Sequence, residues 1–146
     1  MLIENTKDID LSIIKKRNKF IIIYRKLNKP EDIESILKFR QQCKSKSIKF
    51  FIANNYSLAI KTNSDGVYIS ANNHGYKSLN LKRNNFDIIG SAHNIKELNK
   101  KIKQVCSYIL LSRLFRVTYK TKLNFLGLCK FNIFLTKTKN KVKPVS

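Results

Sequence analysis

The sequence has few of the residues that interrupt a chain. Its 146 residues include two prolines, four glycines and no tryptophan. Flexible linkers are normally rich in glycine, serine or proline, so the scarcity of these breaks predicts one continuous domain, which we place at residues 1–135. Residues 136–146 are rich in lysine and are expected to form either a basic tail or the start of a further strand.

Cysteine is also scarce. Cys43, Cys106 and Cys129 are far apart and form neither a C-x-x-C pair nor a Cys/His spacing, which argues against a disulfide framework and a structural zinc site. No apolar run approaches the roughly 18 residues of a membrane span. The opening segment Met1–Asn5 lacks the basic and small-residue pattern of a signal peptide. We therefore expect a cytoplasmic protein without a membrane partner.

Acidic residues are few as well, with nine against 30 lysines and arginines and a net charge of +21. Such a charge suits nucleic acid, because lysine and arginine neutralise phosphates. However, lysine outnumbers arginine 24 to 6, whereas base and phosphate recognition favours arginine. The lysines are also spread along the whole chain with many isoleucines and asparagines, as a codon bias toward A and T would produce. A solvated basic surface is favoured, and a non-catalytic nucleic-acid-binding module is the alternative.

Short apolar runs recur along the chain at intervals of about one helical length. Several are continuous rather than alternating, as expected for strands that are covered on both faces. The strand candidates are Leu2–Ile3, Phe20–Tyr24, Phe50–Ala53, Val67–Ile69, Ile88–Ile89 and Tyr108–Leu111.

Helical patterns lie between these runs, and strand and helix therefore alternate, which predicts a parallel sheet with right-handed crossovers. In the last helix, Ile95, Leu98 and Ile102 form one apolar stripe. The predicted helices are Leu11–Arg17, Pro30–Arg40, Leu58–Ile60 with a cap at Asn55, and Ile95–Lys103 with a cap at Asn94.

Three pieces of the chain carry a family resemblance. Asp65–Ser70, Phe86–Asn94 and Ser107–Ser112 follow one another in the order and spacing of the thiamine phosphate synthase/TenI family of TIM barrels. The resemblance implies an α/β fold, namely a truncated TIM-barrel-like (βα) repeat with a mostly parallel sheet of about six strands. It is expected to be truncated because a complete barrel of this kind needs roughly 250 residues.

The resemblance also implies a chemistry. Enzymes of this family join a pyrimidine pyrophosphate to a thiazole phosphate, release pyrophosphate and form thiamine phosphate. We therefore expect a thiamine phosphate synthase-like transferase whose ligands are these phosphorylated small molecules. A TenI-like protein, which binds or isomerises a thiazole phosphate without magnesium, is the alternative on the same scaffold.

Four residues match family positions that bind substrate or pyrophosphate. Arg25 remains from a Gln-x-Arg-x-Lys pattern, and its guanidinium can hold phosphate through two hydrogen bonds; a structural arginine is the alternative. Ser91 would donate its hydroxyl beside the amino terminus of the next helix, where an anion is favoured. His93 belongs to the same segment and is more simply interpreted as a histidine that orients the loop. Lys120 matches the lysine of a loop that closes over pyrophosphate.

Two other positions depart from the family pattern. Magnesium-binding aspartates follow the family's third and fourth strands, and here Asn54 and Asn73 stand in those places. Magnesium needs carboxylate oxygens, so we expect no bound cofactor. We also expect weak or no synthase activity, because the leaving pyrophosphate would lose its electrostatic stabilisation. No catalytic residue is assigned.

The end of the sequence matters for the same comparison. The family's last two strands end in glycine-rich turns that bind the thiazole phosphate. The sequence ends at Lys143–Ser146, where the resemblance predicts the start of a truncated seventh strand, and that phosphate site is expected to be missing. An incomplete barrel leaves a strand edge open, which would favour a homo-oligomer.

Overall fold

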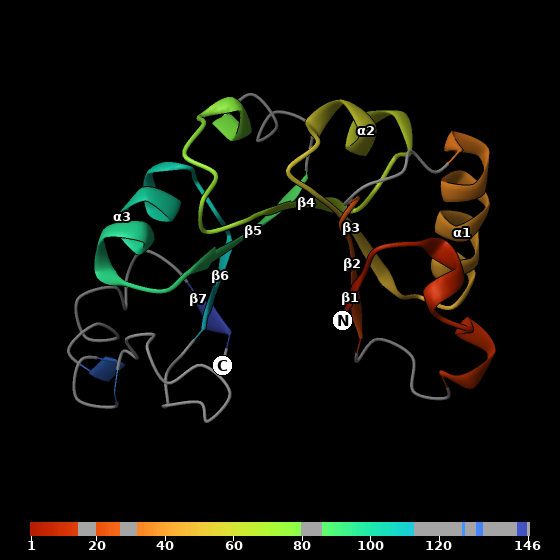
Figure 1. Ribbon diagram of the computed structural model, residues 1–146, viewed down its shortest axis with the longest axis horizontal. Helices are drawn as coiled ribbons and strands as arrows, with labels where there is room; N and C mark the ends of the chain where they lie inside the picture. The colour runs from red at the N-terminus through yellow and green to blue at the C-terminus, as the bar shows by residue number, and fades with distance from the viewer. Residues whose placement is uncertain are drawn as a thin grey trace. The chain divides into compact units, whose positions relative to one another are not determined.

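The structure is a computed structural model, and it describes residues 1–14, 20–26, 32–79, 86–112, 127, 131–132 and 143–145. The chain falls into two compact units, Met1–Tyr68 and Ile69–Ser146, and Figure 1 labels their helices and strands. Within the described ranges, every helix is too short or too polar to cross a lipid bilayer.

The first unit is a parallel sheet in which each strand lies beside the next strand of the chain. The register places Ile23 beside Phe51, and Phe51 beside Gly66. The predicted parallel pairing is therefore confirmed for these strands, and their carboxyl ends share one edge. The strands are β1 (Leu2–Ile3), β2 (Ile21–Tyr24), β3 (Lys49–Ala53) and β4 (Gly66–Ile69), whose last residue begins the second unit. The helices are η1 (Thr6–Asp8), η2 (Leu11–Ile13), α1 (Ile33–Ser45) and α2 (Tyr56–Lys61).

Aromatic rings fill the layer between this sheet and α1. Phe39 of α1 meets Phe50 of β3 edge to face, with 5.7 Å between the ring centroids, and the ring centroid of Tyr24 lies 6.4 Å from that of Phe50. Edge-to-face packing is favoured by the charge distribution of aromatic rings. Ile22 and Phe51 are buried as well, so β2 and β3 are covered on both faces, as their continuous apolar runs predict.

Helix α1 differs from the predicted Pro30–Arg40 segment. It begins at Ile33 and continues to Ser45, while residues 30–31 lie outside the described ranges. Its buried side chains are Ile36, Phe39 and Cys43, and this spacing carries the apolar face beyond the predicted end. The Leu11–Arg17 prediction corresponds to the short 3-10 helix η2 in its described part.

The second unit repeats the same arrangement. Strands β5 (Asp87–Ala92), β6 (Tyr108–Leu111) and β7 (Lys143–Val145) are parallel and follow the chain order, and helix α3 (Ile95–Lys103) connects the first two. Strand β7 falls within the segment for which a tail or a strand was expected. Every described strand pair in either unit is parallel, and helices alternate with strands, so the α/β prediction is confirmed.

Helix α3 packs on β5 with a face that the sequence predicted only in part. Leu98 is buried as expected, but Ile95 is 48% exposed and Lys101 is fully buried. The predicted stripe through Ile95 is therefore wrong. A lysine can take a core-facing position because its long stem packs like an aliphatic side chain, provided that its ammonium finds hydrogen-bond acceptors.

Candidate functional site

Two predicted site residues follow neighbouring strands of the first unit. Arg25 comes directly after β2, and its backbone N–H donates to the carbonyl oxygen of Ile3 at 2.8 Å. Asn54 comes directly after β3, and its N–H donates to the carbonyl oxygen of Tyr68 at 2.8 Å. Both side chains are exposed. Because β2 and β3 are adjacent and parallel, the structure brings both residues to the carboxyl edge of the same sheet.

The backbone of Asn54 has an unusual conformation that explains an asparagine there. Its φ angle is 56°, in the left-handed region that asparagine tolerates better than most residues. The next residue, Asn55, accepts a hydrogen bond from the N–H of Leu58 at 3.0 Å and caps α2 as predicted. Asn54 therefore turns the chain from β3 into α2, a structural role that needs no ligand.

A half-open cavity of about 300 Å³ lies close to this edge, between β2, α1 and α2. Its lining includes the buried side chains of Tyr24 and Ile36 and two lysines. Neither Arg25 nor Asn54 lines it, so the cavity is separate from the predicted site. Its described lining residues are Tyr24, Lys26, Ile33, Ile36, Asn55, Ser57, Leu58 and Lys61.

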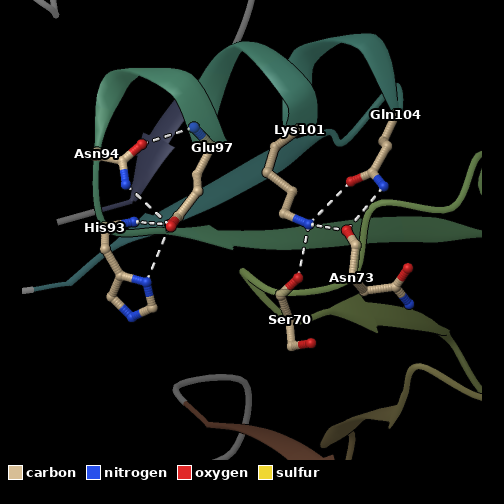
Figure 2. Close-up of polar contacts among 7 residues, drawn as sticks. All are labelled: Ser70, Asn73, His93, Asn94, Glu97, Lys101 and Gln104. Atoms are coloured by element: carbon tan, nitrogen blue, oxygen red, sulfur yellow. Dashed lines mark hydrogen bonds and ion pairs between the residues drawn. The ribbon is translucent and has the colours of Figure 1, made fainter.

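In the second unit, Ser91 and His93 belong to the end of β5 and the turn that follows it. Ser91 lies inside β5 and is 8% exposed. The N–H of His93 donates to Oε2 of Glu97 at 2.7 Å, and Nδ1 of its ring lies 3.0 Å from the same oxygen (Figure 2). The N–H of Glu97 in turn donates to Oδ1 of Asn94 at 2.9 Å, which confirms the predicted cap of α3. Glu97 thus holds both the backbone and the ring of His93 at the start of α3.

The Glu97 carboxylate also occupies the position at the start of α3 where an external anion would be favoured. Burial alone raises the pKa of Glu97, but hydrogen bonds from His93 and Asn94 and the attraction of His93 outweigh burial, so its pKa lies below the usual value. Glu97 is therefore an anion at neutral pH. Its charge opposes a second anion at the same backbone groups, a feature that the sequence comparison missed.

Asn73 lies in the loop after β4, and its side-chain amide forms a hydrogen bond within that loop. Its Oδ1 accepts a hydrogen bond from the N–H of Gly75 at 3.0 Å, and its N–H donates to the carbonyl oxygen of Ser70 at 3.0 Å. Its carbonyl oxygen accepts two more hydrogen bonds, from Nζ of Lys101 at 2.8 Å and from Nε2 of Gln104 at 3.0 Å. Asn73 is thus a central member of a polar network that joins this loop to α3 (Figure 2).

Sequence reasoning missed Lys101 and Gln104, although both are fully buried. One signal was available. Lys101 stands three residues after Leu98, so a charged residue occupies a position on the apolar face of the helix. A lysine at such a position must find buried hydrogen-bond acceptors for its ammonium.

The residues at the two predicted metal positions do not fit magnesium. Asn54 and Asn73 offer neutral amide oxygens, and that of Asn73 already accepts a hydrogen bond from Gly75. Magnesium is bound in proteins through at least one or two carboxylates. In the part of the chain that the structure describes, no three His, Cys, Asp or Glu side chains are grouped so that they could hold a metal ion. Lys120 lies outside the described residues.

Known proteins resemble this chain in sequence and in fold. A family model described as thiamine monophosphate synthase matches residues 2–145. The thiamine-phosphate synthase of Prochlorococcus marinus subsp. pastoris is 26% identical over 105 residues, which are 71% of this chain and 30% of that protein.

Among solved structures, a thiamine phosphate pyrophosphorylase from Pyrococcus furiosus matches with a TM-score of 0.62 and 18% sequence identity, over 86% of this chain and 61% of that one. The chain therefore spans less than two thirds of the length of both relatives. The structural likeness shows a fold of the same TIM-barrel-like type.

Proposed function

Because the chain belongs to the thiamine monophosphate synthase family, we propose that it binds phosphorylated small molecules, pyrophosphate among them, and forms thiamine phosphate weakly or not at all. The relatives named above are a thiamine-phosphate synthase and a thiamine phosphate pyrophosphorylase. In a TIM-barrel-like fold, the loops at the carboxyl ends of the strands build the site. The proposed ligand site uses those loops here.

The amides at positions 54 and 73 carry the proposal. In this family, release of pyrophosphate builds negative charge that magnesium and its carboxylates stabilise, and such electrostatic stabilisation is usually the largest catalytic contribution. Asn54 and Asn73 supply no negative charge to hold the metal. The expected result is a protein that retains ligand binding but has lost most of its catalytic rate.

Other side chains support anion binding independently of the two asparagines. Arg25 is exposed at the end of β2 and has five N–H donors for phosphate oxygens. Ser91 offers a hydroxyl in the second unit, and Lys120 is the third proposed contact. His93 is assigned an orienting role through Glu97 rather than a contact of its own. Among the described residues we propose Arg25 as an anion contact of the first unit and Ser91 as an anion contact of the second.

Restoring both carboxylates tests this assignment. Calorimetry should give the same pyrophosphate affinity for the unaltered protein in EDTA and in Mg²⁺. In the double variant Asn54→Asp, Asn73→Asp, Mg²⁺ should tighten pyrophosphate binding by about tenfold, equivalent to about 1.4 kcal/mol. The charge-matched control is Asn72→Asp, Asn99→Asp, because both residues are exposed and neither is a predicted metal position. Mg²⁺ should leave the control unchanged.

An assay of thiamine phosphate formation can contradict the proposal. Thiamine phosphate formation by the unaltered protein at about 1 s⁻¹ or faster, within the ordinary range of enzymes, would contradict the weak-activity proposal. Failure to bind pyrophosphate would contradict the anion site.

The TenI-like alternative is favoured by the same two amides, since binding or isomerising a thiazole phosphate would need no magnesium. It predicts that thiazole phosphate binds without metal and that pyrophosphate does not compete with it. Competition calorimetry separates the two functions. We further propose a cytoplasmic location and self-association, the latter testable by sedimentation velocity.

A further inference from the structure

Lys101 is a charged side chain buried completely inside the second unit. Its Nζ donates to the carbonyl oxygen of Ser70 at 2.7 Å, to that of Asn73 at 2.8 Å and to Oε1 of Gln104 at 2.9 Å. An ammonium has three N–H donors, so these bonds satisfy it completely. All three acceptors are neutral oxygens, and the ammonium is therefore balanced by dipoles at contact distance.

Gln104 completes the same network. While its Oε1 accepts from Lys101, its Nε2 donates to the carbonyl oxygens of Asn73 at 3.0 Å and Gly75 at 2.7 Å. The carbonyl oxygen of Gln104 accepts a hydrogen bond from the buried hydroxyl of Ser78 at 3.0 Å. Two side chains at the end of α3 therefore hold three carbonyl groups of the 70–75 loop. A fully satisfied buried network of this kind makes a segment rigid.

The fold leaves space for the lysine stem. A Cβ atom at Gly90 of β5 would lie 3.0 Å from Cδ and 3.2 Å from Cγ of Lys101, and 2.8 Å from Sγ of Cys106. The stem thus passes β5 where that strand has no side chain. Burial lowers the pKa of Lys101; electrostatic interactions with Cys106 and Glu97 oppose that shift, and the charge of Lys100 adds to it.

The side chains of Ser70 and Asn73 lie on the side of the loop away from Lys101 (Figure 2). Figure 2 shows the carbonyl oxygens of Ser70 and Asn73 turned toward Lys101, while the hydroxyl of Ser70 and the amide of Asn73 point away from it. Backbone carbonyls fixed on one side of a loop determine where its side chains point on the other. The ammonium therefore fixes the backbone from which both polar side chains project, and the N–H of Gly75 holds the amide of Asn73.

We propose that Lys101 is a positioning residue, which orders the 70–75 loop from the helix side without a metal ion and so prepares the loop for anion binding. The inference rests on the proposed function for the ligand, but the order of the loop is measurable without any ligand. It requires that removal of the ammonium loosen the loop and weaken the site, although Lys101 itself is too deeply buried to touch a ligand.

The test compares Lys101→Met with Lys100→Met. Both variants remove one positive charge from α3, but Lys100 is exposed. Hydrogen exchange is measured at the N–H of Asn73 and of Gly75, which close the loop, and at the N–H of Leu98, which bonds to the carbonyl oxygen of Asn94 at 3.0 Å within α3. In Lys101→Met the two loop amides should exchange at least about tenfold faster, with Leu98 unchanged. Lys100→Met should behave as the unaltered protein.

Pyrophosphate calorimetry on the same variants measures the effect on the site. Lys101→Met should weaken binding by about tenfold, in EDTA and in Mg²⁺ alike, and Lys100→Met should bind as before. Equal loop exchange in the two variants would overturn the ordering role. Faster loop exchange with unchanged pyrophosphate affinity would overturn the link to binding, and a slowing of loop exchange by Mg²⁺ in the unaltered protein would overturn metal-free ordering.

Two further results keep the test decisive. If Lys101→Met fails to fold, Gln104→Leu removes the bonds to Asn73 and Gly75 while Lys101 keeps its bonds to Ser70 and Asn73. That variant should speed exchange at Gly75 more than at Asn73, and equal rates to the unaltered protein would contradict the network. If the unaltered protein binds no pyrophosphate, the proposed function fails, and loop exchange alone decides the role of Lys101.

Discussion

At the scale of single residues, Gly90 is a position where the packing excludes any side chain. A Cβ atom there would lie 2.8 Å from Sγ of the buried Cys106, closer than real Cβ contacts. We expect Gly90→Ala to lower the free energy of unfolding by about 1–3 kcal/mol, because an added carbon in a filled core forces its neighbours apart. The control is Gly75→Ala, whose Cβ would lie 3.4 Å from Oδ1 of Asn73 at an exposed position. Urea unfolding measures both, and equal losses would show that the Gly90 site can relax.

At the scale of elements, helix α3 depends on its cap. Oδ1 of Asn94 accepts from the N–H of Glu97, and its Nδ2 donates to Oε1 of Glu97 at 3.0 Å. We expect Asn94→Ala to reduce the free energy of unfolding by about 1 kcal/mol, since it leaves an N–H at the helix start without its partner. Asn99→Ala is the matched control on the same helix, at an exposed interior position where alanine is the better helix former. If the cap contributed nothing, Asn94→Ala would be as stable as the unaltered protein.

At the scale of the whole molecule, the charge of +21 is the dominant property. The outward face of α3 carries exposed lysines at positions 96, 100 and 103, spaced as one helical stripe. If this charge is a solvated surface, the protein should elute from a DNA column and from a simple sulfonate exchanger at the same salt concentration, because charge alone would then hold it on either column. Elution from DNA at clearly higher salt would instead support the nucleic-acid-binding alternative.

The sequence by itself determined the parallel α/β repeat, the family and the caps of α2 and α3. These features depend on local signals. A continuous apolar run forms a strand covered on both faces, and an asparagine just before a helix supplies an acceptor to an N–H only a few residues away. The family positions Ser91 and His93 likewise lie only two residues apart. Such signals need no knowledge of which distant segments meet.

The tertiary structure alone decided which polar groups are buried and what they hold. Lys101 lies in a lysine-rich stretch, and only the approach of the 70–75 loop supplies the carbonyl oxygens that make its burial stable. Arg40 likewise pairs with Asp65 at 2.9 Å across a long sequence separation. The pairing of Glu97 with His93 is local in sequence, but its consequence at the start of α3 depends on the turn's geometry. A buried charge needs hydrogen-bond or ion-pair partners close to it in space. The spacing of residues along the chain does not show which distant residues will supply those partners.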